Sequence, residues 1–201
     1  MTQGVQLIVG DKVSCDDHGP RVGGAFLKPQ DIEWPIDSDG NPLTLILSIP
    51  TSALLPSGDR FPNFWVSVFV KYSATDYCLD AVTCNDAQSF KENIGRTTKV
   101  LIHRPGDPVT MGVEVPSRRI ERGAAVHQDS FSGSKWAGEP TFLQKNPLPI
   151  PEFMEFLLQL YSSDLSDEIP DLLGLPDSVG YLFLPSHSSD NIDGIFFAQC
   201  T

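Results

Sequence analysis

The feature that most constrains the fold of this chain is a pattern that occurs twice along it. The stretch RVGGAFLKPQ, which begins at Arg21, is echoed by KWAGEPTFLQ, which begins at Lys135. Two apolar runs repeat at nearly the same offset: LILSI (45–49) corresponds to FLLQL (156–160), and the run at 64–70 corresponds to VGYLFL (179–184). This period is far longer than that of a solenoid repeat, so the pattern predicts an internal duplication whose two half-units share one core.

The length agrees with this organisation. A chain of 201 residues can bury a sizeable core and fits one compact domain. We therefore expect a single domain over residues 1–201. It would consist of a half-repeat at 21–72, an irregular β-rich connector at 73–134 and a second half-repeat at 135–201.

The first half-repeat carries the clearest signals of local structure. Asp39-Gly40 is a strong turn signal, and it leads into an apolar run at 43–49 that predicts a buried strand. Trp34-Pro35 precedes the turn, and we expect Trp34 to be packed. The aromatic and valine-rich run FWVSVFVKY (64–72) is the clearest strand in the chain.

Other runs are interpreted with the repeat in mind. Residues 156–161 also fit a helix face, but the echo of 45–49 favours a strand. A first strand is expected at 5–9, a loop at 123–133 and a short acidic helical turn at 163–173. Two hairpins are expected, one formed by 98–103 with 109–115 and one by 181–184 with 195–199.

The negative charge is concentrated at one end of the chain. The formal net charge is −12, and residues 151–201 contain nine acidic residues and no Lys or Arg. Such a field repels nucleic acid and anionic membranes and attracts a basic partner. A solvated acidic surface that aids solubility is the competing interpretation.

The repeated motifs resemble the YwqG-like family, a bacterial family of uncharacterised function. The resemblance rests on Gly23-Gly24, Trp34-Pro35, the turn Asp39-Gly40-Asn41-Pro42-Leu43 and the strand that follows it, with a second copy at 138–140 and 157–160. Ser48 stands where the family usually has Gln. The resemblance implies an α+β fold that is predominantly antiparallel β, with a duplicated unit. Because family members often lie beside secreted polymorphic toxins, it also implies an immunity role.

Two patterns suggest metal sites. The spacing of Asp37, Asp39 and Asn41 matches the first ligands of an EF-hand calcium loop. However, Pro42 and Ser48 stand where that loop needs Gly and Glu. Cys15 and His18 have zinc-like spacing, and Cys78 and Cys84 could complete four ligands, although their own spacing is wider than usual. We expect no metal, no cofactor and no disulfide, and we interpret the cysteines as reduced thiols.

Two patterns suggest acyl transfer. Ser132 and Lys135 match S-x-x-K, but the companion motifs of Ser–Lys enzymes are absent from the sequence. His127, Asp129 and Ser130 are triad residue types, yet triads assemble in space rather than in sequence. No nucleophile elbow or nucleotide-binding loop is present in the sequence, so we expect a protein that is not an enzyme.

The leading candidate site is an acidic set near the C-terminal end. Aligned carboxylates with an aromatic neighbour could meet Lys or Arg around a basic partner and accelerate association. The expected function is that of a cytoplasmic immunity protein that neutralises a cognate secreted toxin, possibly a nuclease, by direct binding. The alternative is a small-molecule or metal-dependent enzyme with a cleft between the half-units. The predicted partner-binding residues are Tyr161, Asp164, Asp167, Glu168 and Asp171.

Overall fold

The structure is a computed structural model that describes residues 3–54, 61–73, 75, 78–126, 133–165, 168, 171–186 and 193–201. Strands dominate these residues, and all pairings between the named strands are antiparallel. The expected α+β class with predominantly antiparallel sheet is confirmed.

The elements of the described residues follow the chain from β1 to β12, with three short α-helices and one 3-10 turn. They are β1 (Val5–Lys12), β2 (Arg21–Val22), β3 (Phe26–Lys28), β4 (Thr44–Pro50), α1 (Thr51–Leu54), β5 (Trp65–Val70), α2 (Leu79–Val82), α3 (Ala87–Asn93), β6 (Thr98–His103), β7 (Asp107–Val109), β8 (Arg118–Ala125), β9 (Lys135–Trp136), β10 (Met154–Tyr161), η1 (Ser162–Asp164), β11 (Val179–Pro185) and β12 (Ile195–Gln199).

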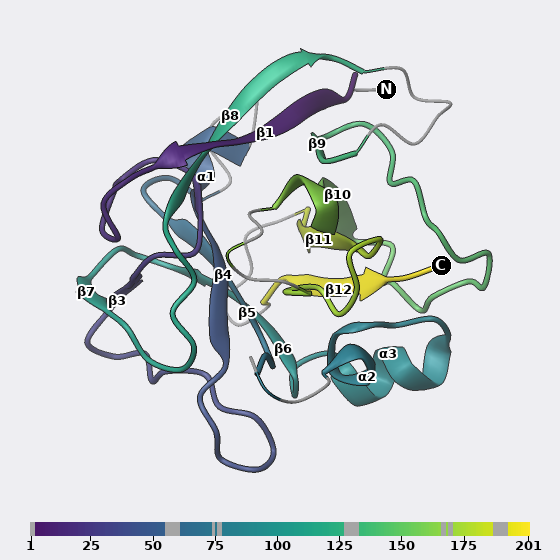
Figure 1. Ribbon diagram of the computed structural model, residues 1–201, viewed down its shortest axis with the longest axis horizontal. Helices are drawn as coiled ribbons and strands as arrows, with labels where there is room; N and C mark the ends of the chain where they lie inside the picture. Colours follow the sequence, from purple (N-terminus) through teal and green to yellow (C-terminus); the bar gives the residue numbers. More distant parts are fainter. Residues whose placement is uncertain are drawn as a thin grey trace.

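Ten of these strands form one sheet in the order β12-β11-β10-β9-β1-β8-β2-β4-β5-β6. The terminal strands β12 and β6 contact each other, so the sheet curls into a nearly closed barrel (Figure 1). A separate two-stranded sheet, β3–β7, lies on the side of the molecule away from β10, β11 and β12. Near-closure protects the two sheet edges, which would otherwise offer unpaired backbone groups to other chains.

The barrel interior holds the main core. Side chains alternate along the strands, and inward positions such as Ile46, Val68, Leu158 and Leu182 are fully buried together. Two further clusters lie outside the barrel wall. One, around Phe26, packs on the first half, and the other, around Tyr181, packs on the second half.

The two halves of the sheet correspond in geometry. β1 and β8 lie at the centre of the sheet. Outward from β8 the order is β2-β4-β5-β6, and outward from β1 it is β9-β10-β11-β12, so each strand of one half has a counterpart at the same position in the other. The register of β4 with β5 shifts between Leu45 and Leu47, and that of β10 with β11 shifts between Phe156 and Leu158. The division into two half-units at the expected boundaries, and their descent from one duplicated unit, stay predictions.

The corresponding glycine-containing pairs share an unusual backbone conformation. Gly23 and Gly24 have φ of 63° and 81°, and Ala137 and Gly138 have φ of 53° and 76°. A Cβ on Gly23 would lie 2.4 Å from the carbonyl oxygen of Val115, which explains glycine at this position. Each pair turns the chain directly after the short central strand, β2 or β9.

Several local predictions are confirmed. Residues 156–161 are strand rather than helix, because they lie between β9 and β11 in the sheet. β11 and β12 form the closing antiparallel pair. Trp34 is packed, and its indole Nε1 donates to the carbonyl oxygen of Leu43 at 2.9 Å. Gly40 has φ of 83° in the expected turn.

Two local predictions are wrong, and the connector contains helices that were not expected. The expected hairpin of 98–103 with 109–115 does not form, because β6 pairs with β5 whereas β7 pairs with β3. The expected loop at 123–133 begins too early, because β8 continues to Ala125 as the partner of β1. Residues 127–132 of that loop lie outside the described residues. Helices α2 and α3 occupy part of the connector that was expected to be β-rich.

Candidate functional site

The predicted acidic set lies at the end of β10 and in the segment that follows it. Tyr161 is the last residue of β10, is half-buried, and packs against the outer cluster around Tyr181. Asp164, Glu168 and Asp171 are all exposed. Asp167 lies outside the described residues. The structure therefore places three of the predicted carboxylates at the surface and fixes Tyr161 in the wall of the barrel.

Asp164 supports the neighbouring strand. Its carboxylate oxygen Oδ2 accepts a hydrogen bond from the backbone N–H of Ser134 at 2.8 Å. Ser134 is buried and directly precedes β9, and its hydroxyl accepts from the N–H of Tyr161 at 2.8 Å. The pair of hydrogen bonds ties the end of β10 to the start of β9, so Asp164 has a structural role beside any role in binding.

Glu168 is compensated by two cations. Its oxygen Oε1 lies 2.7 Å from Lys12 Nζ and 3.5 Å from Arg118 Nη2. The hydrogen bond from Lys12 is the main cause that lowers the pKa of Glu168. Asp171 adopts φ of 56°, and its carbonyl oxygen accepts from the N–H of Gly174 at 2.8 Å. The acidic set thus includes one carboxylate that is already ion-paired within the chain.

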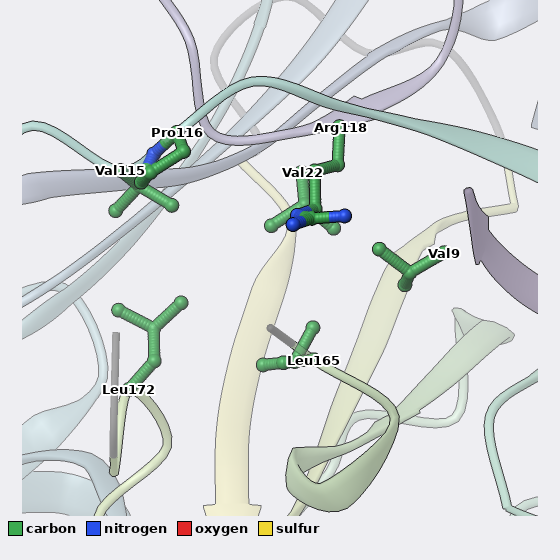
Figure 2. Close-up of a pocket in the computed structure, with 7 residues that line it drawn as sticks. All are labelled: Val9, Val22, Val115, Pro116, Arg118, Leu165 and Leu172. Atoms are coloured by element: carbon green, nitrogen blue, oxygen red, sulfur yellow. The ribbon is translucent and has the colours of Figure 1, made fainter. Parts of the chain in front are cut away.

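A pocket opens beside this segment at the wall formed by β1, β2 and β8 (Figure 2). It holds about 270 Å³ between its atoms, part of it open to solvent. Val22 lines it from the first expected half-unit, and Leu165 and Leu172, from the segment after β10, line it from the second. The lining residues are Val9, Val22, Val115, Pro116, Arg118, Leu165 and Leu172.

Arg118 is the charged residue of this lining. It pairs across the sheet with Val22 on one side and Lys12 on the other. Figure 2 shows its guanidinium turned toward the centre of the pocket, above Leu165. Its Nη1 donates to the carbonyl oxygen of Gly10 at 3.3 Å, whereas its buried Nε has no hydrogen-bond partner among the described residues. The next residue, Arg119, instead donates to half-buried Asp17 at 3.3 Å.

A second polar cluster lies on the outer face of the first half. Arg21 is completely buried, and its Nη2 donates to the carbonyl oxygen of Ala25 at 2.7 Å. Its guanidinium lies 5.5 Å from the ring centre of Trp65. Burial lowers the pKa of Arg21, an effect opposed chiefly by the charge of Asp17. Ser48 faces it across the strands, with a buried hydroxyl that has no partner among the described residues.

The corresponding residue of the second half is also a buried cation. Lys135 is 1% exposed and lies beside Gln159, as Arg21 lies beside Ser48. Its Nζ donates to the hydroxyl of Thr141 at 2.9 Å, and burial lowers its pKa. Both cations hold the segment that follows the left-handed turn, so these residues position the chain that covers the outer face of the sheet.

The structure brings together a Ser–His pair that sequence reasoning missed. Ser67 Oγ lies 2.8 Å from His103 Nε2, and His103 Nδ1 lies 2.8 Å from the carbonyl oxygen of Arg104. Because a carbonyl can only accept, Nδ1 carries the proton and Nε2 accepts from Ser67. Both residues are at most 2% exposed, and burial lowers the pKa of His103. The pair is covered by Phe26, whose ring centre lies 4.8 Å from that of His103.

The calcium-like loop has a structural role, whereas most residues of the acyl-transfer patterns lie outside the described residues. The carboxylate of Asp37 accepts from the N–H groups of Asp39 and Asn41 at 2.9 Å and pairs with Lys71 Nζ at 2.9 Å. The hydrogen bond from Lys71 is the main cause that lowers the pKa of Asp37 to about 2. Ser132 of the S-x-x-K pattern lies outside the described residues, and so do the triad-type residues His127, Asp129 and Ser130.

The cysteines are separate thiols. Cys15 is exposed, Cys78 is half-buried, and Cys84 and Cys200 are buried, each without a disulfide. Burial raises the pKa of Cys84 to about 12. Across the described ranges, no three His, Cys, Asp or Glu side chains gather in a geometry that could hold a metal ion.

Comparison with protein families and with curated proteins gave no match to this chain. In the described part of the chain, the helices are all too short or too polar to cross a bilayer.

Proposed function

We propose that this chain is a cytoplasmic, non-enzymatic immunity protein of the YwqG-like kind that neutralises a cognate secreted toxin by binding it. The observation that carries the proposal is the charge distribution: nine of the acidic residues and no Lys or Arg occur in residues 151–201. Three of those acids, Asp164, Glu168 and Asp171, are exposed and follow one another at intervals of four and three residues. A basic effector that acts on nucleic acid would be complementary to this field.

Two further features support a binding role. Asp164 anchors the segment after β10 to the residue that precedes β9, so the sheet supports that segment. The best-defined pair of reactive side chains, Ser67 and His103, is buried beyond the reach of a substrate. Of the motifs that carry the resemblance to the YwqG-like family, Gly23-Gly24 in the first half and Gly138 in the second share a left-handed backbone conformation.

Co-expression tests the proposal directly. We expect the protein to restore growth of cells that express the toxin encoded beside its gene, and to co-purify with that toxin. Neutralising Asp171 with Asp171→Asn is expected to weaken the complex, whereas Glu114→Gln, an equal charge change at an exposed residue outside the acidic segment, is expected to leave it unchanged. If neither rescue nor co-purification occurs, the proposal is wrong.

The alternative function is a small-molecule or metal-dependent enzyme. One observation favours it: the pocket of Figure 2 is lined by residues from both expected half-units. Its metal-dependent form predicts stoichiometric metal in the purified protein and loss of that metal in Cys15→Ser and His18→Ala. Purified protein without metal would eliminate that form, and a screen of turnover in pocket variants would test the rest.

A further inference from the structure

The loop that leads into β4 and the segment after β7 present the most exposed apolar side chains. Ile36 is 58% exposed and Met111 is 48% exposed, the two highest values among the large apolar residues of the described ranges. Both lie beside exposed Pro42: Ile36 forms an isolated antiparallel bridge with it, and a Cβ on Gly112 would lie 3.4 Å from its carbonyl oxygen. Ile36, Pro42 and Met111 are therefore neighbours, and together they are termed the tip patch.

The backbone under the tip patch is fixed by hydrogen bonds. The N–H of Leu43 donates to the carbonyl oxygen of Pro35 at 2.9 Å, and the N–H of Asp37 donates to that of Asn41 at 2.8 Å. The buried carboxylate of Asp37 accepts from the N–H groups of Asp39 and Asn41. A surface that is held in place before binding loses less conformational entropy when a partner docks. The loop before β4, which projects beyond the barrel, thus presents its apolar side chains in a preorganised form (Figure 1).

The charges around the tip patch define its partner. Ranges 29–43 and 105–112 contain five acidic residues and no Lys or Arg, and the acids are Asp31, Glu33, Asp37, Asp39 and Asp107. All of them except Asp37 are exposed. The flanking cations Lys28, Lys71 and Arg104 are fewer than the acids, and Lys71 is already paired with Asp37 and Asp39. A second copy of this chain would bring the same negative charge to the patch, so the charge disfavours self-association and favours a basic partner.

We propose that the tip patch docks a basic protein segment in which a bulky apolar side chain lies between Lys or Arg residues. The apolar side chain packs on Ile36, Pro42 and Met111, and its burial supplies most of the affinity. The flanking cations meet the exposed carboxylates of the two ranges and chiefly raise the rate of association. This surface lies on the first half and shares no residue with the acidic segment after β10. The inference therefore goes beyond the proposed toxin site and does not depend on it.

The experiment titrates a hexapeptide, Trp-Leu flanked on each side by two lysines, into the purified full chain and follows the methyl NMR signals of Ile36 and Met111. We expect saturable shifts at both residues. Comparable shifts are not expected with a peptide that has Ser-Ser in place of Trp-Leu, or with one that has Glu in place of every Lys. Ile36→Ser is expected to weaken binding by roughly fivefold or more. Ile8→Ser is the matched control, because it removes a 40% exposed isoleucine on β1, and it is expected to leave the affinity unchanged.

Met111→Ser supplies a separate arm on the second segment of the patch, and it is also expected to weaken binding. Absent shifts at Ile36 and Met111, or equal shifts with the Ser-Ser peptide, would overturn the proposal. So would equal affinities in Ile36→Ser and Ile8→Ser, or an unchanged affinity in Met111→Ser. Saturable shifts centred on Asp171 instead would place the peptide on the acidic segment and would likewise overturn it. None of these results bears on rescue from a toxin, so the two proposals fail separately.

Discussion

Gly23 shows how a single residue sets the path of the chain. Its φ of 63° lies in the left-handed region, and a Cβ there would meet the Val115 carbonyl oxygen at 2.4 Å. Gly40 has a similar φ of 83°, but a Cβ there would meet nothing within 4 Å. A substitution at Gly40 therefore measures the free-energy cost of the left-handed backbone alone, whereas one at Gly23 adds the cost of a steric clash.

We predict that Gly23→Ala lowers the free energy of unfolding by more than about 3 kcal/mol, whereas Gly40→Ala lowers it by about 1 kcal/mol, the conformational cost alone. Urea unfolding followed by circular dichroism measures both. Equal losses in the two variants would contradict the close approach of Gly23 to Val115.

His103 makes the stability of the protein depend on pH. Burial lowers its pKa in the folded state, so below about pH 6.5, the ordinary value, the unfolded chain binds a proton more readily than the folded chain. We predict that the free energy of unfolding is highest above that pH and falls as the pH drops toward the folded-state pKa. His103→Gln should flatten this part of the profile. The same slope in His103→Gln as in the unmodified protein would show that His103 does not titrate in this way.

Asp37 acts in a lower pH range. Its folded-state pKa of about 2 lies below the ordinary value of 3.8, so its contribution to stability is complete above about pH 4 and is lost as the pH falls toward 2. We predict that Asp37→Asn lowers the free energy of unfolding by about 2 kcal/mol at neutral pH, because charge-assisted hydrogen bonds are lost. Asp39→Asn, at a more exposed partner of Lys71, should cost much less. Thermal unfolding between pH 2 and 7 gives both values, and equal losses would contradict the account.

At the scale of elements, the segment after β10 combines support and recognition. Asp164 accepts a hydrogen bond from the N–H of buried Ser134, whereas Asp171 is exposed and accepts from Gly174 through its backbone carbonyl. We predict that Asp164→Ala lowers the free energy of unfolding by about 1–2 kcal/mol, since it removes the acceptor of a buried donor. Asp171→Asn, which retains tolerance of a left-handed backbone, should change it by less than about 0.5 kcal/mol. Unfolding in urea measures both free energies. If Asp164→Ala were as stable as the unmodified protein, Asp164 would have no structural role.

The elements that sequence reasoning found are those with strong local patterns. β4, β5, β11 and β12 are apolar runs bounded by turn residues, and β10 was assigned correctly only because the repeat outweighed a helix-like pattern. β8 was missed because its strand begins with a basic cluster, Arg118-Arg119, and its pairing with β1 spans more than a hundred residues. Tertiary pairing decides such a segment, and local propensity does not reveal it.

The candidate sites were predictable to a smaller degree. The exposed carboxylates were visible as charge, but the ion pair of Glu168 with Lys12 joins residues far apart in the chain. The pocket and the inward turn of Arg118 depend on the curl of the sheet, for which the sequence carries no short signal. The Ser67–His103 pair likewise arises from the adjacent strands β5 and β6.

At the scale of the whole molecule, the last quarter of the chain carries nine acidic residues and no Lys or Arg, although Glu168 and Asp193 are paired with cations of other elements. Charge of this kind acts mainly on the rate of association with an oppositely charged partner, and salt screens it. A complex formed through this surface should therefore associate more slowly as the salt concentration rises, while its dissociation rate changes less.

The most direct measurement is the association rate of the purified protein with the toxin encoded beside its gene, as a function of salt concentration. The account predicts a rate that falls steeply with salt, and a smaller slope when Asp167, Glu168 and Asp171 are neutralised together but not when Glu114 is neutralised. A complex whose salt dependence is unchanged by the triple variant, or the absence of any complex, would contradict the central claim.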